Sequence, residues 1–223
     1  MKKLILVAGV FALAATLLCA ATAGAASFQN GSFEGLVLTG NVLDDGLLTV
    51  TNPDASTIPS WSVGGPSGGS VDWVSYLLWT PQDGEDSIDL SGTFGNMNWI
   101  SQAFDTVAGQ SYQVTFWMAG NFIGTTVPKS MLVTAGSFSQ EYTEDYAPMV
   151  FNGSFYEPAW SQQTFQFKAT GSLTTLKFAD TSGNDMEGVI VDNVSVTAVP
   201  EPSSIIALIG GLGSLLAFRR RRA

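Results

Sequence analysis

Apolar and polar residues alternate along most of this chain, and the middle of the sequence shows no sustained repeat of apolar residues every three to four positions. The clearest example is the segment 112–119, where Tyr112, Val114, Phe116 and Met118 share one parity. Successive side chains of a strand point to opposite faces of a sheet, so this pattern predicts a half-buried β-strand whose apolar face packs on a core.

Shorter alternating runs, separated by Gly, Pro, Asn and Asp, predict further strands. They lie at residues 71–76, 87–90, 99–104, 129–133, 164–168, 173–178 and 189–197. We expect an acidic loop or a short hairpin at 41–54, a Gly/Ser turn at 64–70 and a long acidic and aromatic loop at 138–158. Eight or nine strands in roughly 170 residues fit an all-β fold, a β-sandwich of jelly-roll type. A loop as long as 138–158 is often functional in a compact domain.

The N-terminus predicts a secretory signal peptide over residues 1–25, forming a signal helix. Lys2 and Lys3 precede an apolar run over 4–18, and Ala23 and Ala25 provide a cleavage site of the A-x-A type. A membrane anchor is the alternative, although a spanning helix needs about 20 apolar residues.

The C-terminal segment, residues 199–223, consists of three parts in order. They are the motif Pro200, Glu201 and Pro202, an apolar run over 205–218, and the cluster Arg219, Arg220, Arg221 and Arg222. The apolar run would make a short helix of roughly 21 Å, less than the ~30 Å hydrocarbon core of a bilayer. The arginines would remain on the cytoplasmic side. The segment therefore predicts a stop-transfer helix that keeps the chain in the inner membrane only until it is processed, with a plain tail anchor as the alternative.

This pattern resembles the PEP-CTERM sorting signal of exopolysaccharide-producing Gram-negative bacteria. The resemblance implies that an exosortase-type transpeptidase cuts the chain near Pro200, Glu201 and Pro202. It also implies that the protein is exported to the cell surface or the extracellular matrix.

Charge is divided unevenly along the chain. Six of the nine basic residues lie in the two end segments, and the body over 26–198 holds three lysines against eighteen acidic residues, a net charge near −15. Such a body repels nucleic acid, whereas it suits divalent cations or simple solubility. The chain has no histidine, and its one cysteine, Cys19, lies in the leader. Ser–His–Asp catalysis, Cys–His catalysis and the usual zinc sites are thereby excluded from the body.

The last predicted strand carries a carboxylate in an unexpected position. Asp192 has the parity of Ile190, Val194 and Val196, and would share their buried face. A carboxylate there is costly unless it is paired or bound to a metal. A β-bulge at Asp192-Asn193 would reverse the parity and remove the conflict. Both explanations remain open from the sequence.

The body, residues 26–198, resembles the choice-of-anchor C family of secreted domains. The matching segments include Asn30-Gly31-Ser32-Phe33-Glu34-Gly35, Ile58-Pro59-Ser60-Trp61, Ile100-Ser101-Gln102-Ala103-Phe104 and Val191-Asp192-Asn193-Val194. The resemblance implies a galactose-binding-like sandwich whose first and last strands lie side by side. It also implies a structural Ca²⁺ held by Glu34 and Asp192, with a backbone carbonyl at Ser32 or Asp192 and a contribution from the turn 83–85. The alternative is that Glu34 and Asp192 only accept hydrogen bonds from nearby backbone.

Aromatic residues suggest a ligand-binding face. The chain has six tryptophans, and we consider Trp79, Trp117 and Tyr156 as candidates that contact a glycan, with core packing as the alternative for each. These features predict a non-enzymatic protein that binds carbohydrate, or has a structural role, in the exopolysaccharide of a biofilm. The alternatives are a surface protein without a specific ligand and a carboxylate-based glycan hydrolase.

Overall fold

The computed structural model describes residues 27–36, 46–93, 97–123, 127–183 and 186–200. Within these ranges the chain is all β, and no described segment is a helix that could cross a membrane. Two predicted groups of residues lie outside the described ranges. They are the signal peptide with its cleavage residues Ala23 and Ala25, and the C-terminal segment that follows the exposed Pro200: Glu201, Pro202, the apolar run and the four arginines.

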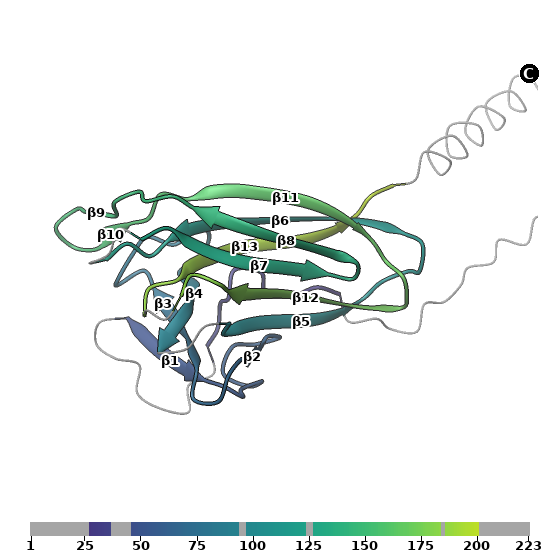
Figure 1. Cartoon of the computed structure of the whole chain (residues 1–223), viewed down its shortest axis with the longest axis horizontal. Coiled ribbons are helices and arrows are strands. Elements are labelled where there is room, and N and C mark those ends of the chain that lie inside the picture. The colour runs from purple at the N-terminus through teal and green to yellow at the C-terminus, as the bar shows by residue number, and fades with distance from the viewer. Residues whose placement is uncertain (1–26, 37–45, 94–96, 124–126, 184–185, 201–223) are drawn as a thin grey trace, which may run out of the picture.

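Two antiparallel sheets pack face to face as a sandwich, which confirms the predicted fold class (Figure 1). The six-stranded sheet has the order β1 (Leu47–Thr51), β3 (Ser70–Ser75), β4 (Asp86–Thr93), β13 (Val189–Ala198), β6 (Ser111–Gly120) and β11 (Ser161–Lys168). The five-stranded sheet has the order β2 (Ser62–Gly64), β5 (Trp99–Asp105), β12 (Leu173–Asp180), β7 (Lys129–Ala135) and β8 (Phe138–Glu144). A small hairpin of β9 (Val150–Phe151) and β10 (Tyr156–Glu157) extends from one end.

The main core lies between the two sheets and follows the predicted alternation. Val114, Phe116 and Met118 of β6 are fully buried in it, and Tyr112 packs against its edge. The ring of Phe116 lies 5.2 Å from that of Phe178 on the opposite sheet, in an edge-to-face arrangement. Because the even residues of β6 cover the core, its odd residues face the other side of the six-stranded sheet, which we call the outer face.

A β-bulge in β13 resolves the conflict at Asp192. The register against β6 shifts between Asp192 and Ser195, and Asn193 adopts a positive φ of 46°. Val191 before the bulge and Val194 after it therefore both face the core, while Asp192 points to the outer face. The bulge is the explanation that holds, and the expected common face of Asp192 and Val194 was wrong.

The predicted long loop at 138–158 was too long. Its first part is strand β8, which pairs along its whole length with β7, and its last part contains the hairpin β9–β10. Strand β8 was missed because its outward residues are polar and exposed, and only Tyr142 is buried on the core side. Strand β1 lies inside the segment 41–54, which was expected to form a loop or a short hairpin.

The N-terminal segment lies directly against the bulge of β13. The backbone N–H of Val194 donates to the carbonyl of Gly31 at 2.9 Å. A Cβ atom on Gly31 would overlap the carbonyl oxygen of Val194, which is backbone and cannot rotate away.

We predict that Gly31→Ala lowers the free energy of unfolding by roughly 2 kcal/mol or more, because the first segment must move away from β13. The measurement is denaturant unfolding followed by tryptophan fluorescence. Gly171→Ala is the matched control, since a Cβ there meets no atom within 4 Å, and its effect should remain within about 0.5 kcal/mol. Equal stability of the two variants would contradict this account of the contact.

Candidate functional site

Two carboxylates, one from the first segment of the domain and one from its last strand, hold one turn, residues 82–86, which we call the acidic turn. Oε1 of Glu34 accepts hydrogen bonds from the backbone N–H groups of Glu85 at 2.8 Å and Asp86 at 3.2 Å. From the other side, Oδ2 of Asp192 accepts from the backbone N–H groups of Gln82 at 2.7 Å and Asp83 at 2.9 Å. The N-terminal segment and the last strand are thus joined through the turn.

The structure therefore brings together the residues that the sequence analysis proposed as calcium ligands. The hydroxyl of Ser32 also reaches the turn and donates to Oδ2 of Asp83 at 2.7 Å. The hydrogen-bonding alternative describes the contacts that Glu34 and Asp192 make. Within the part of the chain that the structure describes, no group of three or more His, Cys, Asp or Glu residues is arranged to hold a metal ion.

The carboxylates at this turn lie in an environment that disfavours their charged forms. Burial raises the pKa of Asp86 to about 7, with further contributions from the negative charges of Glu34 and Glu85. Burial also raises the pKa of Asp192 to about 7, although the hydrogen bonds that it accepts from backbone N–H groups oppose the shift. Negative charge is concentrated here, and no basic residue in the described part of the chain acts on either group.

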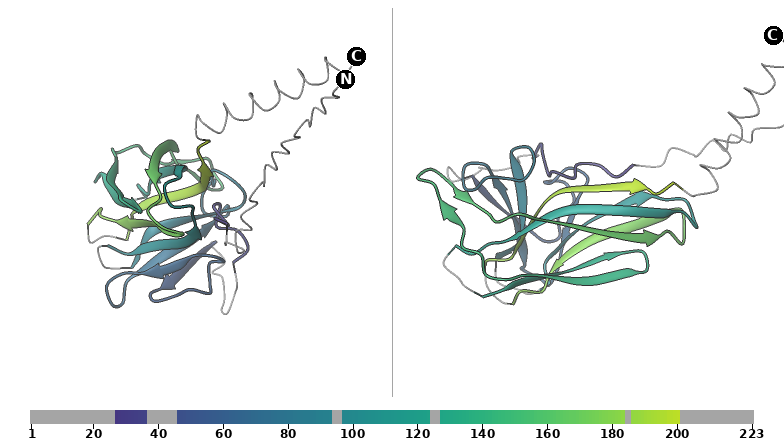
Figure 2. Two further views of the ribbon diagram at one scale, coloured as in Figure 1. Left: turned by 90° about the vertical axis from the view of Figure 1, so that its right-hand side faces the viewer. Right: turned by 90° about the horizontal axis from the view of Figure 1, so that it is seen from above.

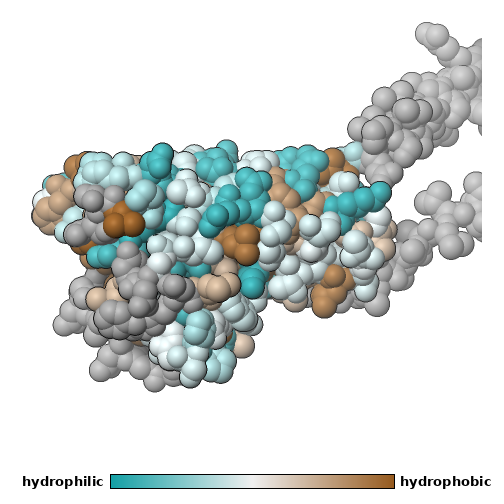
Figure 3. Space-filling view, viewed as in Figure 1, coloured by the Kyte–Doolittle hydropathy of each residue, from teal (hydrophilic) through white to brown (hydrophobic). Residues whose placement is uncertain are grey.

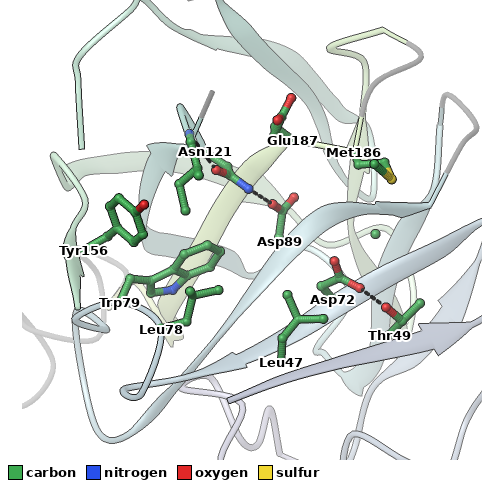
Figure 4. Close-up of a pocket in the computed structure, with 12 residues that line it drawn as sticks. Leu47, Thr49, Asp72, Leu78, Trp79, Asp89, Asn121, Tyr156, Met186 and Glu187 are labelled. Atoms are coloured by element: carbon green, nitrogen blue, oxygen red, sulfur yellow. Dashed lines mark hydrogen bonds between the residues drawn. The ribbon is translucent and has the colours of Figure 1, made fainter. Parts of the chain in front are cut away.

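A pocket of about 560 Å³ lies on the outer face of the six-stranded sheet, next to the loop that precedes the acidic turn (Figure 4). Its floor contains Thr49 from β1, Asp72 from β3 and Asp89 from β4. These residues are direct neighbours across the strands, because Thr49 pairs with Asp72 and Asp72 pairs with Asp89. The sheet register thus sets a row of polar groups along the bottom of the pocket.

Two aromatic residues form one wall of the pocket. Trp79 and Tyr156 are joined by a parallel β-bridge, in which the N–H of Tyr156 donates to the carbonyl of Leu78 at 2.9 Å. The indole of Trp79 is only 1% exposed, and its Nε1–H donates to the hydroxyl of Ser87 at 2.7 Å. Tyr156 is partly exposed and lies opposite the acidic floor in Figure 4. Trp79 is therefore fixed in place, and Tyr156 is the accessible ring.

Asp89 is tightly held at the base of the pocket. It is 1% exposed and accepts hydrogen bonds from the amide of Asn121 at 2.8 Å and the backbone N–H groups of Ser91 at 2.9 Å and Gly188 at 3.1 Å. Burial, and then the charge of Asp72, raise the pKa of Asp89 well above its ordinary value, while the donors from Asn121 and Ser91 oppose the shift.

Asp72 differs from Asp89 in having a carboxylate oxygen that reaches the pocket. Its Oδ1 accepts from the hydroxyl of Thr49 at 2.6 Å, and its Oδ2 accepts no hydrogen bond from the described residues. The side chain is 7% exposed, and burial raises its pKa to about 6.

The candidate ligand residues from the sequence thus separate into two groups. Trp79 and Tyr156 line the pocket, whereas Trp117 lies on β6, paired with Gln162 and Asp192, and is not among the lining residues. The sequence analysis missed Asp72 and Asp89 as site residues. Each is a carboxylate between apolar neighbours in a predicted strand, which is a usable signal, but only the pairing of β3 with β4 shows that the two lie side by side.

The raised pKa values predict that stability falls as pH rises. Asp72, Asp86 and Asp192 bind protons more tightly in the folded chain, with pKa values of about 6, 7 and 7 against an ordinary 3.8. Between about pH 4 and pH 7 the folded state therefore holds more protons than the unfolded state, and the free energy of unfolding decreases. We expect a higher melting temperature at pH 5 than at pH 7.5, measured in EDTA at constant ionic strength.

Variants at two positions test which groups cause the melting temperature to depend on pH. Asp72→Asn removes one of the groups and should flatten the pH dependence, whereas Glu157→Gln, at an exposed position, should leave it unchanged. A melting temperature that increases from pH 5 to pH 7.5 would contradict the expected direction.

Solved structures with a similar fold are known. The Stig cyclase Fisc from Fischerella sp. TAU has 16% sequence identity and a TM-score of 0.53, with 79% of this chain and 98% of that chain covered. The carbohydrate-binding module TmCBM61, solved with β-1,4-galactotriose, has 13% identity and a TM-score of 0.44, with 62% and 88% covered. At these identities the likeness concerns the fold alone.

Sequence comparisons find matches to the body of the chain and to its C-terminal segment. Halomucin from Haloquadratum walsbyi is 30% identical over 177 residues, which are 78% of this chain and only 2% of halomucin. Residues 198–222 match the PEP-CTERM protein-sorting motif, which confirms the predicted sorting signal of an exported, cell-surface protein. Residues 26–197 match the family described as Protein of unknown function (DUF642), and the chain belongs to this DUF642 family.

Proposed function

We propose that this protein binds carbohydrate at the outer-face pocket and acts, without catalysis, in the exopolysaccharide or biofilm matrix of a Gram-negative cell. The observation that carries the proposal is the composition of the pocket, in which the accessible ring of Tyr156, packed on the buried indole of Trp79, lies across from the polar groups of Asp72, Asp89 and Asn121. An apolar ring face together with a few fixed polar groups is what a sugar requires, because a sugar presents both C–H faces and hydroxyl edges.

The geometry favours binding over hydrolysis. A glycoside hydrolase needs two carboxyl groups that reach the scissile bond from separate positions, one of them as a free acid or nucleophile. Asp89 is 1% exposed and its oxygens already accept from Asn121, Ser91 and Gly188. Asp72 is left as the one floor carboxylate with an oxygen directed at the pocket, which supports a binding role.

Export and processing complete the proposal. The sorting motif implies that an exosortase-type transpeptidase processes the chain near Pro200 after the signal peptide has directed it across the inner membrane. The domain would then remain at the cell surface or enter the matrix, where polysaccharide is its partner. A surface protein without a specific ligand is the alternative that the binding test decides.

Binding is tested with a glycan array and the full chain in detergent. Tyr156→Ala should weaken binding at least about fivefold, since an aromatic contact is worth about 1 kcal/mol. Tyr76→Ala is the control, because Tyr76 is 49% exposed and is not among the residues that line the pocket. Absence of glycan binding, or equal losses in both variants, would contradict the proposal.

A second proposal concerns Ca²⁺ at the acidic turn. Glu34, Asp192 and Ser32 converge there beside Asp83 and Asp86. A cation would stabilise the charged form of Asp86, whose pKa is raised by burial and then by the negative charges of Glu34 and Glu85. Calcium prefers six to eight oxygen ligands, so backbone carbonyls and water would have to complete the set. The carboxylate oxygens that now accept backbone hydrogen bonds would be shared with the ion.

Calcium binding predicts a metal-dependent melting temperature. At a hundredfold excess over the dissociation constant, calcium would add about 2.7 kcal/mol, or roughly 5–10 °C for a domain of this size. The experiment compares the protein in EDTA and in excess calcium, with Glu34→Gln as the variant that should lose the difference and Glu157→Gln, an exposed residue, as control. An unchanged melting temperature in EDTA would refute the site.

A further inference from the structure

The pocket floor holds two carboxylates in an arrangement that is costly without a ligand. Asp72 and Asp89 are directly opposite each other on neighbouring antiparallel strands and share the outer face. Like charges in this position destabilise a sheet, and burial makes the repulsion stronger. The two side chains are 7% and 1% exposed, so solvent screens them poorly.

Charge in the rest of the pocket has the same sign. A third acidic residue, Glu187, lies among the described residues that line it, and none of these lining residues is basic. Tyr156 carries the one other ionisable side chain among them. The pocket therefore presents a negative potential to whatever enters it.

Asp72 offers a carboxylate oxygen that can accept a hydrogen bond from a ligand in the pocket. Oδ1 is occupied by the hydroxyl of Thr49, whereas Oδ2 accepts nothing from the described residues and is directed into the pocket (Figure 4). Asp89 lies behind it with its own hydrogen bonds made to Asn121, Ser91 and Gly188. A donor that reaches Oδ2 of Asp72 would thus be within the field of both carboxylates.

We propose that the pocket is selective for amino sugars, and that Oδ2 of Asp72 receives the protonated amine of a sugar whose ring lies against Tyr156. This inference rests on the proposed function and names the class of glycan. An ammonium group compensates the negative charge held by the Asp72–Asp89 pair, whereas a neutral sugar leaves that buried charge unbalanced. A uronic acid adds a further negative charge and is rejected.

The expected selectivity can be measured on matched trisaccharides. A β-1,4-linked glucosamine trimer and cellotriose differ only in having an amine or a hydroxyl at C2, and trigalacturonate supplies the acidic case. We expect the full chain in detergent, with EDTA present, to bind the glucosamine trimer about tenfold more tightly than cellotriose, as a charge-assisted hydrogen bond allows. The difference should shrink as salt is added, and trigalacturonate should bind most weakly.

Variants assign the selectivity to the pocket. Asp72→Asn keeps a side chain of the same shape and should reduce the preference for the glucosamine trimer to about threefold or less, while Asp105→Asn removes one charge at the end of β5 and should preserve it. Melting curves of both variants check that they fold. If Asp72→Asn does not fold, the comparison of trimers and the salt dependence on the unmodified chain decide the matter.

The outcomes separate amino-sugar selectivity from carbohydrate binding itself. Cellotriose or trigalacturonate binding as tightly as the glucosamine trimer would overturn the amino-sugar inference and leave carbohydrate binding intact. Binding of none of the trimers or polysaccharides would overturn both. A preference for the glucosamine trimer that survives in Asp72→Asn would refute the role of Asp72.

Discussion

The acidic turn, residues 82–86, is where the two ends of the domain are fastened together. Glu34 from the first segment and Asp192 from the last strand each accept two backbone N–H groups of this turn. A turn has backbone donors that no strand partner can satisfy, and these two carboxylates supply the missing acceptors. Burial at this turn, together with the neighbouring negative charges, raises the pKa values of Asp86 and Asp192, and for Asp192 it does so despite the backbone donors.

The pocket depends on this fastening. The acidic turn is continuous with the loop that carries Trp79, and the N–H of Tyr76 donates to the carbonyl of Glu85 across the base of that loop. Trp79 in turn pairs with Tyr156 from the hairpin β9–β10, whose first strand exposes the apolar side chains of Val150 and Phe151. Hydrophobic atoms are visible at this end of the molecule in Figure 3. Removal of either Glu34 or Asp192 would therefore loosen the acidic turn, and through the continuous backbone it would also loosen the loop that places Trp79 and Tyr156 at the pocket.

Strand β13 runs along the sandwich away from the pocket. It begins beside Glu187 at the pocket and ends at Ala198, next to the sorting motif, at the opposite end of the sandwich (Figures 1 and 2). Ten residues of strand span about 33 Å. The sandwich still holds Val199, whose N–H donates to the carbonyl of Ser111 at 2.8 Å.

Local patterns in the sequence were sufficient for most of the strands, the inward parity of residues 112–119 and the sorting signal, because each depends on neighbours along the chain. The resemblance to secreted sandwich domains also pointed to Glu34 and Asp192, which both bind the acidic turn, while their role as calcium ligands stays a prediction. Tertiary structure decided the rest. The bulge after Asp192 is supported by contact with Gly31, and Asp72 meets Asp89 only through strand register, which is set by hydrogen bonds between segments distant in sequence. The sequence by itself determined which residues alternate and where the protein is sent, and the pairing of the strands decided which carboxylates share a pocket.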